Sequence, residues 1–304
     1  MHIYSHPLCQ QHLVPDGHPE HPKRLEAVLN HLRECGIAQD SPIREASFAG
    51  QEDIARAHSL THIKFVQSIL PSTDTPVPID PDTWASAQSF AAASHAAGAV
   101  LDGVTDLLAG TTQRVFCAVR PPGHHAEQKS AMGFCLFNSI AIGALNALAN
   151  PQIHKVAIVD FDVHHGNGTV DIFKDNPDVL VCSTFQHPHY PNRMFDVQRN
   201  NIINTPLNEG DGSTEFRRQI EADWLPALEQ HKPDVIFVSA GFDAHRDDPL
   251  AQINLLAADY DWVTRLIVDC AIQFSQGRVL STLEGGYNLE ALCESVEAHL
   301  GALR

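Results

Sequence analysis

The sequence predicts an α/β fold with three layers, in which helices cover both faces of a largely parallel central sheet. Three observations lead to this prediction. Short runs of apolar, β-branched residues lack polar alternation, as is typical of strands buried on both faces. Helical patterns separate these runs along the chain. A group of polar and ionisable residues directly follows each run, at the edge where open parallel sheets bind ligands.

The predicted strands are short and rich in Val, Ile, Leu and Phe. In the run Val-Ala-Ile-Val, for example, no charged residue occurs until Asp160. Such runs are expected in the middle of a sheet, because neither face needs to meet water. The five predicted strands span residues 115–119, 156–159, 179–185, 235–240 and 279–283.

Helices are expected between and before these strands, because apolar residues recur there at helical spacing. The stretch Ser213-Thr-Glu-Phe has the composition of a capped helix start. Asn288 is the expected N-cap of the last helix. The predicted helices span residues 20–35, 51–70, 84–109, 137–149, 213–230, 257–276 and 288–303.

Length and composition favour one globular domain over residues 1–304, because α/β folds of this size commonly form a single unit. A net charge of −17 argues against direct nucleic-acid binding, which requires a basic surface. No signal peptide or membrane span is evident, so a membrane role is not expected. Seven scattered cysteines without a Cys-x-x-Cys pair indicate reduced thiols and a cytoplasmic location.

The polar clusters after the strands are expected to meet in space. All carboxyl ends of parallel strands lie at one edge of the sheet, so segments far apart in sequence converge there. The clusters span residues 120–127, 160–169, 186–192, 241–249 and 284–288.

A metal site is predicted within the second of these clusters. Asp162 and His164 are two residues apart, so an extended backbone directs both to one side. Asp243, after the fourth predicted strand, is the best third ligand. Three protein ligands leave one position open, as in catalytic zinc sites, although Fe²⁺ or Co²⁺ also suits nitrogen and oxygen ligands. A buried hydrogen-bonded Asp–His network without metal is the alternative.

Two further clusters carry candidate catalytic groups. His124 and His125 follow the stiff turn Pro-Pro-Gly and suit a general base with an electrostatic partner. Tyr287 follows two glycines, and a phenol there could donate a hydrogen bond to a developing oxyanion. A core tyrosine and incidental loop histidines are the alternatives.

Taken together, the motifs resemble the zinc-dependent histone deacetylase family, in its class II-like branch of bacterial amidohydrolases related to acetylpolyamine amidohydrolases. The resemblance extends over nearly the whole chain and implies the arginase/deacetylase-type fold. The blocks that carry it are His18-Pro-Glu-His-Pro-Lys-Arg-Leu25, Asp80-Pro-Asp-Thr83, Arg120-Pro-Pro-Gly-His-His-Ala126, Gly133-Phe-Cys-Leu-Phe-Asn138, Asp160 to Thr169, Gly241-Phe-Asp-Ala244 and Glu284-Gly-Gly-Tyr287.

The resemblance implies an amide hydrolase and assigns roles by position. Zinc activates water, His125 is the general base, and Tyr287 stabilises the oxyanion. The remaining implied sites are the ligands Asp162, His164 and Asp243; His124 with its support Asp160; Asn167 behind His125, an amide typical of class II; a tunnel of Gly133, Phe134, Tyr190 and Leu250; Arg24 at an inner acetate channel; and a structural K⁺ at Asp160 and Ser183.

The expected substrate is an N-ε-acetyl or short acyl group on lysine. An acetylpolyamine or another small amide is the alternative, because Asp74, Asp80 and Asp82 lie on a candidate rim loop. An arginase-like binuclear manganese hydrolase and a non-catalytic acyl sensor are less favoured. Residues 192–195 stand where many relatives have a glycine-rich turn, so the tunnel rim is expected to differ. We expect a monomer or a small homo-oligomer.

Overall fold

The computed structural model describes residues 1–304 and contains an eight-stranded sheet, in the order β2-β1-β5-β10-β9-β6-β7-β8. Every neighbouring pair in it is parallel, which confirms the predicted sheet. The strands are β1 (His2–Ser5), β2 (Ile43–Glu45), β5 (Arg114–Cys117), β6 (Val156–Asp160), β7 (Val179–Gln186), β8 (Ile202–Leu207), β9 (Val235–Ala240) and β10 (Val279–Leu283).

The five predicted strands are the five adjacent strands in the middle of the sheet, from β5 to β7. The first of them begins and ends earlier than predicted, at Arg114 and Cys117. The sequence analysis missed β1, β2 and β8, which form the two sides of the sheet. Strands β2 and β8 are partly exposed, so their sequences mix polar and apolar residues and contain no continuous apolar run.

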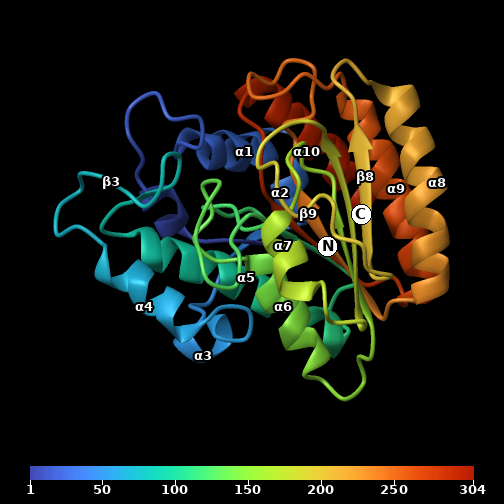
Figure 1. Cartoon of the computed structure of the whole chain (residues 1–304), viewed down its shortest axis with the longest axis horizontal. Helices are drawn as coiled ribbons and strands as arrows, with labels where there is room; N and C mark the ends of the chain where they lie inside the picture. The colour runs from blue at the N-terminus through green and yellow to red at the C-terminus, as the bar shows by residue number, and fades with distance from the viewer.

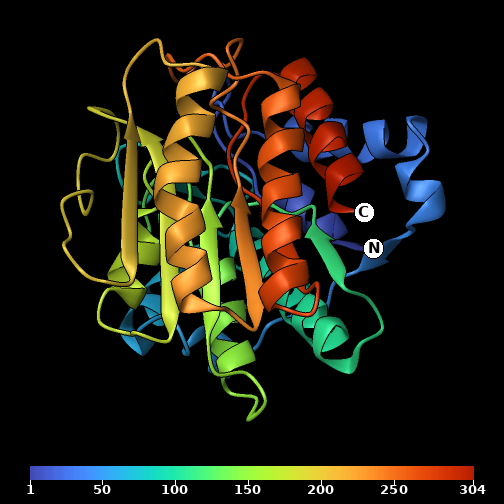
Figure 2. The same ribbon diagram turned by 90° about the vertical axis from the view of Figure 1, so that its right-hand side faces the viewer.

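Helices cover both faces of the sheet, as predicted. One layer contains α5, α6 and α7, and the other contains α8, α9 and α10, with α1 packed against α10 (Figures 1 and 2). The helices of these layers are α1 (Lys23–Glu34), α5 (Ser89–Ala109), α6 (Ser139–Leu148), α7 (Asn167–Phe173), α8 (Ser213–His231), α9 (Ala257–Phe274) and α10 (Leu289–Leu303).

The N-terminal third differs from the prediction in detail. The predicted helix 51–70 is two helices, α3 (Gln51–Ile54) and α4 (Leu60–Ser68), because the Ser59 hydroxyl accepts a hydrogen bond from His62 N and starts a new helix. The predicted helix 84–109 begins only at Ser89. The remaining elements are the 3₁₀ helix η1 (Pro7–Gln11), α2 (Ile37–Asp40) and the antiparallel pair β3 (Val77–Pro78) and β4 (Trp84–Ala85).

The two predicted helix starts have different outcomes. Asn288 caps α10 as predicted, since its side-chain oxygen accepts a hydrogen bond from Ala291 N at 3.1 Å. The predicted cap at Ser213 is wrong. Gly212 precedes α8 without a side-chain cap, and the Ser213 hydroxyl instead donates to Asp259 at 2.6 Å. This bond ties the start of α8 to α9.

One hydrophobic cluster of 74 buried residues extends through the sheet into both helical layers. It includes Phe237 on β9, Ile142 on α6 and Tyr260 on α9. A single domain over 1–304 stays a prediction. No helix of the structure has both the length and the apolar character that crossing a membrane requires.

Candidate metal centre and active site

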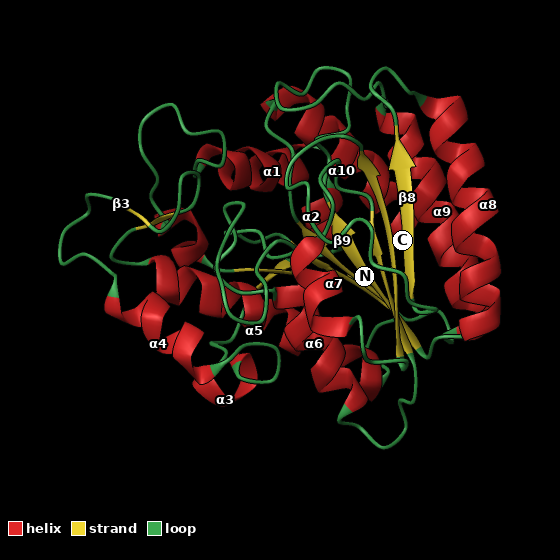
Figure 3. Ribbon diagram, in the orientation of Figure 1, coloured by secondary structure: helices red, strands yellow, loops and turns green.

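The loops after four adjacent strands meet at the carboxyl edge of the sheet. Strands β5, β10, β9 and β6 are neighbours, and each leads into one of the polar clusters. Their loops gather beyond the strand ends (Figure 3). Parallel topology thereby brings residues from positions 120 to 287 to one place.

Asp162, His164 and Asp243 lie together as the sequence analysis predicted. One ligand atom from each falls within 4.8 Å of the others, and all three residues are buried. Nδ1 of His164 is 3.1 Å from Asp162 Oδ1 and 3.1 Å from Asp243 Oδ2. Burial alone would lower the pKa of His164, but its hydrogen bonds to the two carboxylates raise it to about 10. The ligand atoms of the three residues therefore converge at one buried position, where the two carboxylates favour a positive charge.

Backbone groups fix the two carboxylates. Val163 N donates to Asp243 at 2.8 Å, and Gly285 N donates to Asp162 at 2.8 Å. A Cβ atom at Gly241 would collide with the Asp162 carboxylate, and one at Gly285 would collide with Asp243. The chain around the triad therefore requires glycine at both positions, because only glycine lets the backbone approach this closely.

His124 is held by Asp160, as predicted. The Nδ1 atom of His124 lies 2.9 Å from Asp160 Oδ2, and its Nε2 lies 3.8 Å from Asp162 Oδ1. Burial alone would lower the pKa of His124, but the charges of Asp160 and Asp162 outweigh it and raise the pKa well above its usual value. His124 is therefore a buried positive charge beside the triad.

His125 is held by Asn167, also as predicted. Its Nδ1 lies 2.7 Å from Asn167 Oδ1, and the Asn167 amide nitrogen donates to Glu127 at 2.9 Å, which fixes the orientation of the amide. An amide oxygen only accepts, so Nδ1 carries the proton and Nε2 is free to accept one. Burial and then the charges of His124 and His164 lower the pKa of His125 well below its usual value.

The same support continues to the protein surface. Arg193 pairs with Glu127 at 3.0 Å, so a half-exposed arginine is connected through Glu127 and Asn167 to His125. Asn192 and Met194 have φ values of 53° and 63°, in the region that glycine favours. Residues 192–194 therefore form a turn with the positive φ values usual for glycine, although none of them is glycine. Arg193, between the two positive-φ residues, reaches Glu127.

Tyr287 lies at the end of the β10 loop. Its backbone N donates to Asp248 at 2.7 Å, and its ring centroid is 4.8 Å from the guanidinium carbon of Arg24. Burial raises the pKa of Tyr287 well above its usual value, so its hydroxyl keeps its proton. Arg24 is buried and donates to the carbonyls of Glu284 and Gly286, each at 2.6 Å. Arg24 thus supports the Tyr287 loop, and an acetate channel beside it stays a prediction.

A cavity of about 200 Å³ opens above the triad. All four predicted tunnel residues line it: Gly133, Phe134, Tyr190 and Leu250. Its lining also includes His125, His164, Tyr287, Asp82 and His189. A Cβ at Gly133 would collide with the His125 ring, so the wall needs glycine there. Of the three rim aspartates, Asp82 faces the cavity, while Asp80 accepts hydrogen bonds from Asp82 N and Thr83 N.

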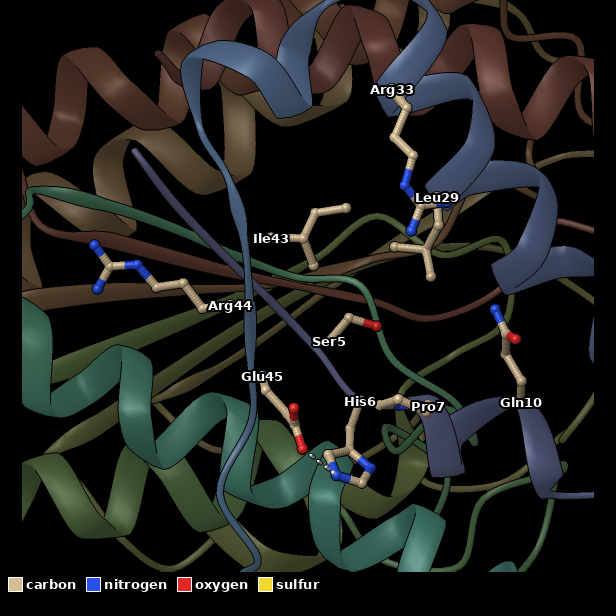
Figure 4. Close-up of a pocket in the computed structure, with 9 residues that line it drawn as sticks. All are labelled: Ser5, His6, Pro7, Gln10, Leu29, Arg33, Ile43, Arg44 and Glu45. Carbon is tan, nitrogen blue, oxygen red and sulfur yellow. Dashed lines mark ion pairs between the residues drawn. The ribbon is translucent and has the colours of Figure 1, made fainter.

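A larger cavity of about 300 Å³ lies between α1, β1 and β2 (Figure 4). Its charged side chains are mostly paired within the protein: Arg44 with His2 and Asp106, and His6 with Glu45 at 3.2 Å. The Arg44 guanidinium points away from the other labelled side chains in Figure 4. None of the predicted site residues lines this cavity, so the smaller cavity is the candidate active site.

Several residues of the site were missed by the sequence analysis. Glu284 is buried and accepts hydrogen bonds from Gly123 N at 2.6 Å and His124 N at 3.2 Å, which fixes the tandem histidines. Glu127, Asp248 and His189 were missed as well. A glutamate directly after a buried strand was a usable signal for Glu284. The others lie within the predicted polar clusters, but no local pattern distinguishes them from the cluster residues that face solvent.

Comparison with known proteins identifies one family. The model of the histone deacetylase domain matches residues 18–303. Histone deacetylase 14, chloroplastic, of Arabidopsis thaliana is 36% identical over 95% of this chain and 73% of its own length. An uncharacterized protein of Synechocystis sp. is 39% identical over 97% of this chain and 96% of its own length. The crystal structure of the HDA15 HD domain superposes with a TM-score of 0.92 at 33% identity, covering 99% of this chain and 87% of that one.

Proposed function

The chain belongs to the histone deacetylase family of hydrolases, and on this premise we propose that it is a zinc-dependent enzyme that removes an acetyl or short acyl group from the ε-amine of lysine. One observation carries the proposal: His164 of the Asp162–His164–Asp243 triad, His125 and Tyr287 line the same cavity.

The triad fits zinc. Its three nitrogen and oxygen ligands are buried and converge, and the glycines around it leave no room for another side chain. When bound, zinc supplies a Lewis acid that polarises the amide carbonyl and makes water more acidic. Fe²⁺ and Co²⁺ suit the same ligands. An arginase-like pair of manganese ions has less support, because Asp162, His164 and Asp243 form the one group of converging metal ligands at this cavity.

His125, Tyr287 and His124 have separate roles in the proposed reaction. His125 is neutral near pH 7 and accepts a proton from the attacking water at Nε2. Tyr287 keeps its proton and donates a hydrogen bond from its hydroxyl to the oxyanion of the tetrahedral intermediate. The positive charge of His124 favours the negative transition state, and a protonated histidine of the pair gives its proton to the leaving amine. Acetate and a free amine result.

The cavity suits an extended acyl-lysine. Phe134, Tyr190 and Leu250 offer apolar walls to the methylene stem, and the polar groups lie at the floor. Asp82 can hold the backbone of a peptide or the far amine of an acetylpolyamine, so the polyamine is the second candidate. Assays of an acetyl-lysine peptide against N-acetylputrescine separate them. A polyamine preference above about tenfold in kcat/KM would reverse our assignment.

A structural K⁺ at Asp160 and Ser183 is also proposed. The two residues are paired in register across β6 and β7, and the buried Ser183 hydroxyl has no hydrogen-bond partner. A cation would satisfy that oxygen. The absence of direct nucleic-acid binding, a cytoplasmic location and a monomer or small homo-oligomer stay predictions; one relative in Arabidopsis and one in rice are named as chloroplastic.

The central experiment measures acetate release from an acetyl-lysine peptide by zinc-loaded protein. We expect Tyr287→Phe to lower kcat by about a hundredfold to a thousandfold, the usual loss for one oxyanion donor. Tyr260→Phe is the matched control, because its hydroxyl is buried in the core without a partner. His125→Ala should also lose turnover while keeping its zinc. Unchanged turnover in both active-site variants would leave the mechanism without support.

A further inference from the structure

A second group of metal-binding side chains lies far from the cavity, where the end of α1 meets α10. His31 and Cys35 are four residues apart on α1, so both face the same side of the helix. Glu297 reaches them from α10, which packs against α1. Ligand atoms of the three residues lie within 4.8 Å of one another. His31 Nε2 is 2.6 Å from Glu297 Oε2.

These side chains are accessible and able to adjust. The side chains of His31 and Glu297 are 29% and 49% exposed, and Cys35 is exposed as well. A cation can therefore enter from solvent and replace the proton that the imidazole and carboxylate share. By contrast, five of the other six cysteines are buried. An exposed thiol next to a histidine and a glutamate is thus found only here.

The ligand types select the kind of metal. Thiolate, imidazole and carboxylate together suit Zn²⁺ or Co²⁺, whereas Mg²⁺ and Ca²⁺ prefer oxygen alone. The location favours a cation for an independent reason. Cys35 is the C-cap of α1, and the C-terminus of a helix carries partial negative charge.

We propose that His31, Cys35 and Glu297 form a second site for a zinc-class divalent cation, with water completing the tetrahedron. The ion would join α1 to α10. Helix α1 carries Arg24, which holds the carbonyls of Glu284 and Gly286, and α10 begins directly after Asn288. The cation therefore fastens together the two helices that flank the Tyr287 loop, and it stabilises the fold.

Cobalt distinguishes the two sites, because the Asp162–His164–Asp243 triad contains no sulfur. Metal-free, reduced full-length protein is titrated with Co²⁺ and followed by near-ultraviolet absorption. We expect a thiolate-to-cobalt charge-transfer band, and two bound cobalt ions per chain by metal analysis. Cys35→Ser should remove the band and one ion, while deacetylase activity stays unchanged. Asp243→Asn should remove the other ion and keep the band.

Matched variants test the ligand set. Glu297→Gln should weaken cobalt binding at this site at least tenfold, whereas Glu294→Gln, an exposed glutamate on the same helix, should not. Cys293→Ser should keep the band, because its sulfur is not among the converging atoms. The thermal midpoint of Asp243→Asn should rise with Zn²⁺, and that rise should vanish when Cys35→Ser is added. A single bound ion without a thiolate band, or a band that survives Cys35→Ser, would overturn the proposal.

Discussion

Two buried charged clusters lie close together in this protein and solve the problem of burial differently. In the first, Glu20 accepts from Arg120 at 2.5 and 2.7 Å and from Arg24 at 2.9 Å, and none of the three is exposed. Remaining arginine donors reach backbone carbonyls, including that of Cys9 at 3.0 Å. All of its polar groups are therefore paired within the protein: the one carboxylate accepts from both guanidinium groups, and backbone carbonyls accept from their remaining donors.

The second cluster has more negative charge than its histidines balance. Asp162 and Asp243 share one imidazole nitrogen, and Asp160 and Glu284 lie behind them. Burial raises the pKa of Asp160 to about 6 and of Glu284 to about 7. Buried carboxylates at this density are tolerated when a cation is available. The comparison teaches that a buried cluster whose groups are all paired within the protein stabilises the fold, whereas a cluster that needs an external cation is suited to catalysis.

The largest expected effect comes from breaking the second cluster. Asp243→Asn should reduce zinc binding and lower kcat/KM by at least about a thousandfold, because the metal supplies several kcal/mol of transition-state stabilisation. Metal analysis and the peptide assay measure both.

The stability of the same variant is a separate test. Burial and the charge of Asp162 raise the pKa of Asp243, so its ionised form is unfavourable without metal. The metal-free variant should therefore unfold at or above the wild-type urea midpoint, and a clear fall would contradict the comparison.

The same exchange in the first cluster should have the opposite effect on stability. Glu20→Gln leaves two buried guanidinium groups without their shared carboxylate, which should lower the free energy of unfolding by about 3–5 kcal/mol. Urea unfolding of the metal-free proteins, side by side with Asp243→Asn, measures the contrast. If both variants shift equally, the two clusters do not differ as argued.

Acid sensitivity sharpens the comparison further. Burial alone would raise the pKa of Glu20, but Arg120 and Arg24 lower it from 4.5 to about 2. Because the pKa falls on folding, this carboxylate stabilises the protein above pH 4.5, and its contribution of about 3 kcal/mol is lost as pH drops toward about 2. Unfolding free energies measured across this window should fall more steeply in wild type than in Glu20→Gln. Parallel pH curves would assign the acid sensitivity to other groups.

The smallest effect concerns the base. The pKa of His125 lies below its usual value, so activity should decline only when acid protonates it, on the acid limb of kcat/KM. Asn167→Asp places a carboxylate at hydrogen-bond distance, which raises the pKa of His125 and moves that limb up by about one pH unit or more. Asn204→Asp is the matched control, because the Asn204 amide oxygen lies 2.9 Å from Nε2 of a different histidine, His165. This change should leave the acid limb in place. A limb that does not move in Asn167→Asp would exclude His125 as the titrating base.

The central strands and the site were predictable for one physical reason. Buried parallel strands have a distinctive composition, and parallel topology forces their carboxyl ends to one edge, so Asp162 and Asp243 could be expected to meet. Strand β8 was not predicted, because it is partly exposed and its mixed polar and apolar sequence resembles that of a loop. The break between α3 and α4 was not predicted, because residues 55–59 contain no Gly or Pro and nothing in the sequence there marks the end of a helix.

By itself, the sequence determined the fold class, the central strands and the residues gathered at their ends, since each follows from local composition and one topological rule. Only the tertiary structure decided that Glu284 holds the tandem histidines, that Arg193 connects to His125, and that Glu297 meets His31 from 266 residues away. Those contacts depend on how helices and loops pack sideways, and lateral packing is set by the shape of the whole core rather than by any periodicity along the chain.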